Sequence, residues 1–395
     1  MSFRVAGFNL GKASLGLALG RVDEQGRFEF EWARSLTHEG NPFAAFSGLY
    51  AEHEIGECAL VAATGTYAGE LREPVLVLPE DACQQAALEL DPEAPPILNL
   101  VSIGGRGYSA LSRRPEPGAG GAYAYRFVES DKCSSGTGEN ILKLTGRFGL
   151  DLEEADAMAR AAEKSIPITA RCSVFAKSEM THYANEGRPK DELLRGYFGS
   201  VARNVRSLLA RVEIDGAIYL VGGAARLETL REALEELVGR SVHRPQHFEC
   251  FEAVGAVALA AEELLRAGAR AYEESGVPLV QTRQKRFQTL PAARRYAGQV
   301  TMMPEPSAPS TLPDEPVVLG LDLGSTGAKA VLTSVATGEP LFDVYDRTRG
   351  NPIEASQRLV RAILESGVPD VRAIALTGSG RQAVATLLGG VFPDR

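Results

Sequence analysis

One short glycine motif occurs twice in this chain of 395 residues, and the repeat constrains the fold more than any other feature. The first copy reads GFNLGKAS at residues 7–14, and the second reads GLDLGSTG at residues 320–327. The same offset of 313 residues brings Ala-Thr-Gly at 63–65 onto Leu-Thr-Gly at 376–378. Two landmarks at one offset indicate a duplicated domain, and we expect the second copy to be represented here by its N-terminal part only.

The composition favours a globular protein that binds small molecules or other proteins. Apolar residues make up 44% of the chain, which is enough to build buried cores. A net charge of -9 argues against a general affinity for nucleic acid or acidic membranes, because both require a cationic surface. The chain has no apolar run of about 18 to 20 residues and no signal-peptide pattern at its N-terminus. We therefore expect a cytoplasmic protein that binds neither nucleic acid nor membrane.

Cysteine and histidine patterns exclude the common zinc signatures. The cysteine count is odd and no CxxC pair occurs, so reduced thiols or another kind of metal ligand remain. His243 and His247 have a spacing that metal ligands use, but Pro245 lies between them and a surface loop is the simpler interpretation. The five cysteines are Cys58, Cys83, Cys133, Cys172 and Cys250.

Strand-like and helix-like segments alternate along the first 267 residues, which predicts an α/β fold. Hairpin strands are expected first, separated by Gly11, Gly20 and residues 23–26. Expected strands cover 5–8, 15–19, 28–32, 59–62, 96–103 and 217–221, and expected helices cover 42–53, 79–90, 134–147, 151–163, 173–185, 190–212, 224–238 and 251–266.

Three parts of the chain follow from these patterns. Residues 1–275 form the first domain. Seven prolines between residues 277 and 316 favour a linker over 276–316, because such a stretch cannot build a core. Residues 317–395 form the truncated start of the second domain.

The second glycine motif is typical of a phosphate-binding hairpin. Gly324 permits the tight turn, and backbone N–H groups with the hydroxyls of Ser325 and Thr326 can receive phosphate oxygens. Asp322 can hold hydrated Mg²⁺, and Lys329 can pair with phosphate. A single motif of this kind is also compatible with an ordinary hairpin, so further motifs must decide.

Two further glycine pairs, 104–105 and 222–223, follow expected strands. With the hairpin they resemble the three nucleotide-contacting motifs of the superfamily that contains acetate and sugar kinases, heat-shock ATPases and actin. In that ribonuclease H-like fold two lobes close over ATP. Residues 131–138 (DKCSSGTG) and 170–179 (ARCSVFAKSE) resemble the NDKCAAGTG and TCTVFAESE segments of the BadF/BadG/BcrA/BcrD ATPase family, the CoA activases of 2-hydroxyacyl-CoA dehydratases and benzoyl-CoA reductases. The resemblance runs over residues 3–267 and again from 317.

This resemblance implies a [4Fe-4S] cluster with Cys133 and Cys172 as ligands, shared across a homodimer or between the two copies of a longer chain. ATP would drive an electron from the cluster into an acyl-CoA dehydratase- or reductase-like acceptor. Each cysteine also stands at the start of an expected helix, where N–H groups stabilise thiolates. The alternative is that both are buried free thiols. The other three cysteines are interpreted as core residues of this kind. The implied nucleotide-binding residues are Gly11, Lys12, Gly104, Gly105, Gly136, Thr137, Gly138, Gly222 and Gly223 in the first copy, and Asp322, Gly324, Ser325, Thr326 and Lys329 in the second.

The first copy departs from the family at its charged positions. Asn9 stands where the family has aspartate, Gly16 stands where it has lysine, and SIGGRGYS at 102–109 stands where it has DIGGQDSK. Asn9 cannot offset the charge of Mg²⁺, and we expect no acid near Gly107 to position an attacking water. Lys12 and Arg106 remain as cations for phosphate. The first copy is therefore expected to bind nucleotide weakly or not at all and to hydrolyse it poorly.

Three functions are compatible with these features. The favoured one is an ATP-dependent activator and electron-transfer component with an iron-sulfur cluster. A second is a non-catalytic pseudo-ATPase scaffold for dimerisation or partner docking, which the degenerate motifs favour. A sugar-kinase-like phosphotransferase ranks lowest, because no convincing base for a sugar hydroxyl is present.

Overall fold

The computed structural model describes residues 2–72, 75–105, 107–118, 121–130, 138–169, 173–267, 293–301, 314–367 and 369–387. These residues form two compact units. Unit 1 comprises the described parts of Met1–Gly146, Leu150–Lys177 and Leu194–Gln281, and unit 2 those of Arg147–Gly149, Ser178–Leu193 and Thr282–Arg395.

The first sheet of unit 1 is the hairpin sheet that the sequence predicts. Its strand order is β3-β2-β1-β4-β5, with antiparallel pairing in the hairpins and parallel pairing of β1 with β4 and of β4 with β5. Gly20 does not end its strand as expected, because β2 continues through a bulge at this position. The elements are β1 (Phe3–Leu10), β2 (Ser14–Val22), β3 (Phe28–Thr37), α1 (Pro42–Glu52), β4 (Leu60–Thr64), β5 (Leu76–Val77) and α2 (Glu80–Leu90).

The second sheet of unit 1 repeats this arrangement. Its order β10-β9-β6-β7-β8 is the order of the first sheet written from the other edge, with the same strand directions. The sequence did not predict β7 and β8, since β7 is buried on both faces over its first six residues and lacks the alternation of a one-sided strand. The strands are β6 (Leu98–Ile103), β7 (Tyr108–Pro115), β8 (Tyr123–Glu129), β9 (Ala217–Val221) and β10 (Val242–His243).

Helices complete the first domain near the positions that the sequence predicts. The apolar stripe of α6 is buried along its length, as its three- and four-residue spacing indicates. The expected helix from 224 begins later, because Leu227 is extended and a 3-10 turn precedes it. The helices are α3 (Gly138–Arg147), α4 (Leu152–Ala161), α5 (Ser173–Asn185), α6 (Lys190–Leu209), α7 (Glu228–Val238) and α8 (Phe251–Ala267), with 3-10 turns η1 (Ile55–Glu57), η2 (Ala68–Glu70), η3 (Gly223–Arg226), η4 (Phe248–Cys250) and η5 (Ala293–Gln299).

Helix α8 joins the two sheets of unit 1. Its apolar residues share one core with Val5 and Ala62 of the first sheet and with Leu98 and Leu100 of the second. A Cβ atom at Gly7 would lie 2.3 Å from the backbone nitrogen of Val257, so α8 packs directly on the backbone of β1. This close approach fixes the start of α8 beside the carboxyl end of β1.

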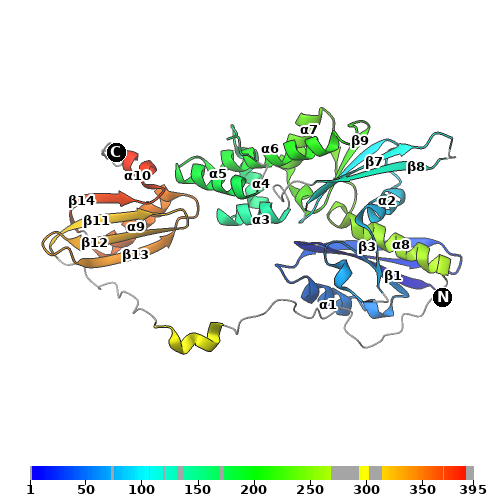
Figure 1. Ribbon diagram of the computed structural model, residues 1–395, viewed down its shortest axis with the longest axis horizontal. Coiled ribbons are helices and arrows are strands. Elements are labelled where there is room, and N and C mark those ends of the chain that lie inside the picture. Colours follow the sequence, from blue (N-terminus) through cyan, green and yellow to red (C-terminus); the bar gives the residue numbers. More distant parts are fainter. Residues whose placement is uncertain are drawn as a thin grey trace. The chain divides into compact units, whose positions relative to one another are not determined.

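The sheet of unit 2 is the third sheet with this arrangement of strands. Its order β13-β12-β11-β14 corresponds to β3-β2-β1-β4, and α9 packs on it (Figure 1). Both helices that follow the third strand begin at an Asn-Pro pair, where Asn41 and Asn351 accept backbone hydrogen bonds. The elements are β11 (Pro316–Leu323), β12 (Gly327–Ser334), β13 (Pro340–Arg347), α9 (Pro352–Ser366), β14 (Asp370–Thr377) and α10 (Arg381–Leu387).

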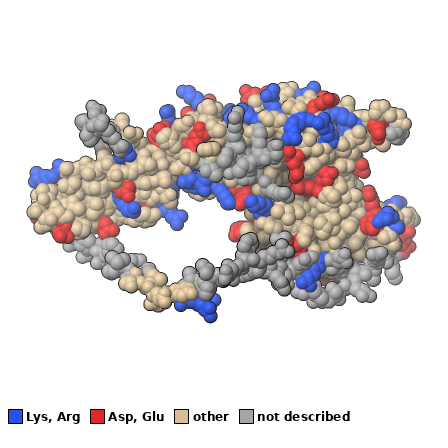
Figure 2. Space-filling view, viewed as in Figure 1, with Lys and Arg blue, Asp and Glu red and all other residues tan. Residues whose placement is uncertain are grey.

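The surface carries mixed charge. Figure 2 shows acidic and basic side chains interspersed on the face drawn there. Within the described parts of the chain, none of the helices has the length and hydropathy needed to cross a bilayer.

Candidate nucleotide site

The glycine turns that the sequence singles out come together in unit 1. Gly11 and Lys12 follow β1, Gly104 and Gly105 follow β6, and the pair 222–223 follows β9. All six residues line one pocket of about 130 Å³. The carboxyl ends of the two central strands therefore meet at a single site, as in other sheets of this architecture.

Close backbone contacts explain the glycines of this pocket. A Cβ atom at Gly105 would lie 2.9 Å from the nitrogen of Ala13, so the two turns touch. Gly222 has φ of +91°, and a Cβ atom there would lie 2.6 Å from the carbonyl oxygen of Ile103. Neither position accepts a larger residue without displacing backbone.

Helix α3 begins beside the glycine turn at residues 104–105. The N–H of Gly138 donates to the carbonyl oxygen of Gly104 at 2.9 Å. The expected site residues Cys133, Gly136, Thr137, Cys172 and Arg106 lie outside the described residues.

The acidic residues of the site are absent from the sequence-based prediction, and Glu252 is the most buried of them. Glu252, in the first turn of α8, is 2% exposed and lines the pocket. Its Oε1 accepts from the Ser102 hydroxyl at 2.8 Å and from Gln84 Nε2 at 3.1 Å, and its Oε2 accepts from Asn9 Nδ2 at 3.3 Å. The sequence predicts no acid near Gly107 to position an attacking water, and that prediction overlooks Glu252, which lines the same pocket as Gly107. A carboxylate is present, supplied by a helix instead of the two strands.

No local signal identifies Glu252. It lies in an apolar helix, and its partners are 150 to 243 residues away in the sequence. The only available hint is a carboxylate on a helix face that is otherwise apolar, which requires a buried partner.

The charged residues of the pocket wall are mostly acidic. Among its described residues, Lys12 is the one cation, and its Nζ lies 2.5 Å from Oε2 of Glu139. Hydrogen bonds from Lys12 and Lys143 hold the pKa of Glu139 below its ordinary value. The acidic residues of the wall are Glu80, Glu129, Glu249 and Glu252.

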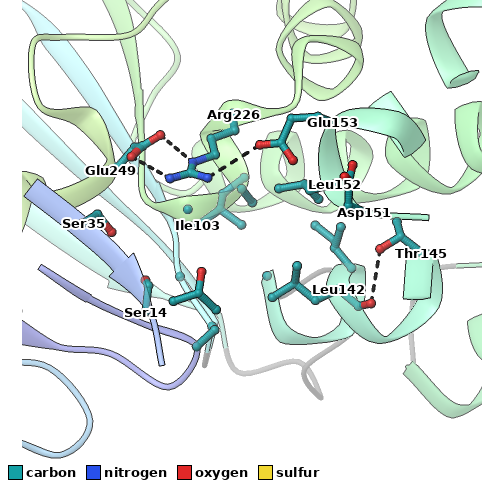
Figure 3. Close-up of a pocket in the computed structure, with 18 of the residues that line it drawn as sticks. Ser14, Ser35, Ile103, Leu142, Thr145, Asp151, Leu152, Glu153, Arg226 and Glu249 are labelled. Carbon is teal, nitrogen blue, oxygen red and sulfur yellow. Dashed lines mark hydrogen bonds and ion pairs between the residues drawn. The ribbon is translucent and has the colours of Figure 1, made fainter. Parts of the chain in front are cut away.

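A second, mostly apolar cavity of about 260 Å³ adjoins the turns (Figure 3). Ile103, Leu142 and Leu152 line it, together with Gly104 and Gly223 of the turns.

Arg226 is bound to two carboxylates. Its Nε lies 2.5 Å from Oε1 of Glu249, and its Nη1 lies 3.7 Å from Oε1 of Glu153. Ion pairing with Glu249 raises the pKa of Arg226 above its ordinary value, so its charge is matched within the protein.

The hairpin of the second copy keeps the turn and adds charge. The N–H of Gly324 donates to the carbonyl oxygen of Gly327 at 3.0 Å, and the β6–β7 hairpin of the second sheet makes the same kind of turn, between Gly104 and Gly107 at 2.9 Å. Asp322 Oδ2 accepts from Lys329 Nζ at 3.2 Å, and both side chains are substantially exposed. Both line a groove in unit 2 with Thr377, while Gly324, Ser325 and Thr326 form the turn beside it.

The three cysteines expected in the core are buried and free. Burial raises the pKa of the Cys58 thiol to about 11 and those of Cys83 and Cys250 to about 12. Within the described residues, no group of three or more histidine, cysteine or acidic side chains is arranged to hold a metal ion. His243 and His247 accordingly form no such site with their described neighbours.

Two sheets of one strand order, with glycine turns meeting between them, define a ribonuclease H-like fold of the actin and sugar kinase class. The crystallised activator of 2-hydroxyisocaproyl-CoA dehydratase from Clostridium difficile, solved with bound ADPNP, superposes with a TM-score of 0.57. The superposition covers 67% of this chain and 97% of that protein at 20% identity. This likeness confirms the predicted fold class.

The family resemblance is also confirmed. Residues 119–260 match the model of the BadF/BadG/BcrA/BcrD ATPase family. The 2-hydroxyisocaproyl-CoA dehydratase activator of Clostridioides difficile is 27% identical over 137 residues, 35% of this chain and 52% of that protein. The (R)-2-hydroxyglutaryl-CoA dehydratase activating ATPase of Acidaminococcus fermentans is 31% identical over 113 residues, 29% of this chain and 44% of that protein. The sequence match thus spans about half the length of these curated relatives.

Proposed function

We propose that this chain is part of an ATP-dependent activator that carries electrons on a [4Fe-4S] cluster to an acyl-CoA dehydratase- or reductase-like partner in the cytoplasm. The observation that carries the proposal is the position of both cysteine segments, 131–138 and 170–179, inside the family match at 119–260. The relatives named above are activators of 2-hydroxyacyl-CoA dehydratases.

The described structure beside the cysteines is suited to thiolate ligands. Helix α5 begins at Ser173, directly after Cys172, and the partial positive charge at a helix N-terminus favours the thiolate. Cys133 precedes Gly138 by five residues, so the chain keeps it within about 18 Å of the second glycine turn. The cluster, held by Cys133 and Cys172, would supply one-electron chemistry next to the nucleotide turns.

The proposal divides the nucleotide chemistry between the copies. The first domain, 1–275, would bind nucleotide weakly through Gly11, Lys12, Gly104, Gly105, Gly136, Thr137, Gly138, Gly222 and Gly223. After the linker at 276–316, the second copy at 317–395 would hold phosphate at Gly324, Ser325, Thr326 and Lys329, with Mg²⁺ bound to Asp322 through water.

A pseudo-ATPase scaffold is the second candidate. The uncharged Asn9 and Ser102 and the internally paired Lys12 favour it, because the part of the pocket that the structure describes then has few groups for Mg²⁺ and phosphate. In this case the first copy would serve dimerisation or docking.

Anaerobic spectroscopy of the full chain separates the two candidates. We expect visible absorption and a reduced-state EPR signal from the wild type, and loss of both in Cys133→Ser and Cys172→Ser. Cys58→Ser is the matched control, since Cys58 is buried in the core. A colourless, iron-free wild type would exclude the electron-transfer proposal for this chain.

Iron content tests how the cluster is shared. A cluster held by two chains gives about two iron atoms per chain, whereas one cluster within each chain gives about four. Sedimentation of the same samples would show whether the iron-loaded species is a homodimer.

A further inference from the structure

Asn9 donates a hydrogen bond to Glu252 in the first copy, where the strand position is neutral. The corresponding strand position of the second copy is charged. In the first copy the carboxylate belongs to α8, and Asn9 donates to it from β1. In the second copy the carboxylate belongs to the strand itself, at Asp322. Asn9 and Asp322 occupy the same register, since Asn9 pairs with Thr64 and Asp322 pairs with Thr377. Within this chain, the first copy therefore has its carboxylate on α8, and the carboxylate of the second copy lies on the strand itself.

The copies also differ at position 16, where the first has glycine and the second has Lys329. Gly16 lies opposite Asn9, as Lys329 lies opposite Asp322. A Cβ atom at Gly16 would lie 2.8 Å from the Cβ of Cys250, so the segment leading into α8 fills the place of a side chain there. The N-terminus of α8 therefore occupies the space beside both Asn9 and Gly16 in the first copy.

An aspartate at position 9 is incompatible with this arrangement. Its carboxylate would lie beside the Glu252 carboxylate in a buried place, and like charges at such a distance destabilise one another. The amide at position 9 is therefore required by Glu252.

The same carboxylate opposes polyphosphate. Glu252 adds a buried negative charge to a wall that already contains Glu80, Glu129 and Glu249. Among the residues that the structure describes, the cations beside the turns are Lys12 and Arg226, and their charges are matched by Glu139 and by the pair Glu249 and Glu153. The adjoining cavity of about 260 Å³ is mostly apolar and remains suited to a small planar group.

We infer that Glu252 is the specificity-determining residue of the first-copy site: its oxygens already accept from three protein donors and are not available to Mg²⁺, so its charge disfavours polyphosphate and leaves the adjoining cavity to an uncharged, nucleoside-like ligand. The inference deepens the proposed function, because it concerns the nucleotide site of the same domain. It does not depend on the iron-sulfur cluster.

A charge-relocation cycle in the full chain tests the pair. Asn9→Asp alone lowers the unfolding temperature of the first domain by roughly 5 °C, because two buried carboxylates then meet. Asn9→Asp/Glu252→Gln exchanges donor and acceptor within the same hydrogen bond, and restores most of that loss. Additive effects of the two changes would overturn the coupling.

Calorimetric titration with adenosine, ADP and Mg²⁺-ATP tests the ligand class. Wild type binds adenosine more tightly than Mg²⁺-ATP, and Glu252→Gln raises the affinity for ADP at least about tenfold, or about 1.4 kcal/mol. Glu262→Gln removes the same charge from an exposed position on the same helix, and leaves all three affinities within about twofold.

Two results would overturn the inference. One is tight Mg²⁺-ATP binding by the wild type that Glu252→Gln abolishes, since Glu252 would then serve the nucleotide. The other is failure of adenosine to bind any variant. An iron-free protein with the expected titrations would instead contradict only the electron-transfer proposal, so the two tests fail independently.

Discussion

The first hairpins of the two copies share a backbone and differ in chemistry. Asn9 and Asp322 have the same partners in register, Thr64 and Thr377 on one side and Gly16 and Lys329 on the other. The first copy places neutral groups at these positions, and the second places an ion pair there. Strand pairing and glycine turns therefore preserve the shape of a phosphate hairpin after its charges have changed.

The two central strands also differ in burial. Strand β1 is buried on both faces because α8 covers the face that includes Gly7. On β11, one face is buried by the α9 core, and Val318, Gly320 and Asp322 on the other remain half-buried. The same strand pattern thus experiences two packing environments within one chain, which makes matched substitutions informative.

The largest expected effect is at the strand glycines. Gly7→Ala places a methyl group 2.3 Å from the backbone nitrogen of Val257, so α8 must shift, and we expect destabilisation of about 3 kcal/mol or more. Denaturant unfolding followed by fluorescence of Trp32, the single tryptophan of the chain, reports on unit 1.

Gly320→Ala is the matched control for this prediction. Its methyl group would lie 3.1 Å from Cγ1 of Val331, a side chain that can move, and we expect a cost below about 1 kcal/mol for unit 2, whose unfolding is followed by circular dichroism because it has no tryptophan. Equal costs at both positions would show that α8 does not pack on β1 as described.

The next largest effect is expected at alkaline pH, which should destabilise unit 1 more than unit 2. The pKa of the Cys58 thiol is raised to about 11 and those of Cys83 and Cys250 to about 12, so the folded state keeps protons that the unfolded state releases near pH 9. Stability contributed by the buried neutral thiols is complete below pH 9 and is lost as the pH rises towards 12.

Between pH 9 and 10 each thiol should cost unit 1 up to about 1.4 kcal/mol. Unit 2 has no cysteine among its residues and should not share this loss. A stability of unit 1 that is constant from pH 8 to 10, measured by Trp32 fluorescence, would contradict the burial of these thiols.

The smallest expected effect is at the exposed ion pair of the second copy. Asp322→Asn removes the partner of Lys329, and because both side chains are well exposed we expect less than about 1 kcal/mol of destabilisation. Lys329→Ala should have a similar effect, and the double variant should add little. A cost of several kcal/mol at Asp322 would mean that this carboxylate has a structural role like that of Glu252.

Local sequence patterns predicted much of the fold. The hairpin strands, the strands before each glycine pair and the stripe of α6 follow from periodicity and turn residues, and the glycine turns do meet. These features depend on neighbouring residues, which a sequence displays directly.

The features that sequence patterns missed depend on distant contacts. Strand β7 is covered on both faces, so its residues do not alternate. Glu252 is defined by Asn9, Gln84 and Ser102, which come from three other elements. The sequence shows that the first motif has Asn9 in place of an acid. The carboxylate of Glu252 beside Asn9 becomes visible only in the packing of α8.

We expect the first copy to keep the shape of a nucleotide site without its ATPase chemistry. The decisive measurement is Mg²⁺-dependent ATP hydrolysis by the full chain, compared with the Asp322→Asn and Glu252→Gln variants. No turnover above background is expected in Asp322→Asn. Robust turnover that Asp322→Asn leaves intact and Glu252→Gln abolishes would show that the first copy is an active ATPase.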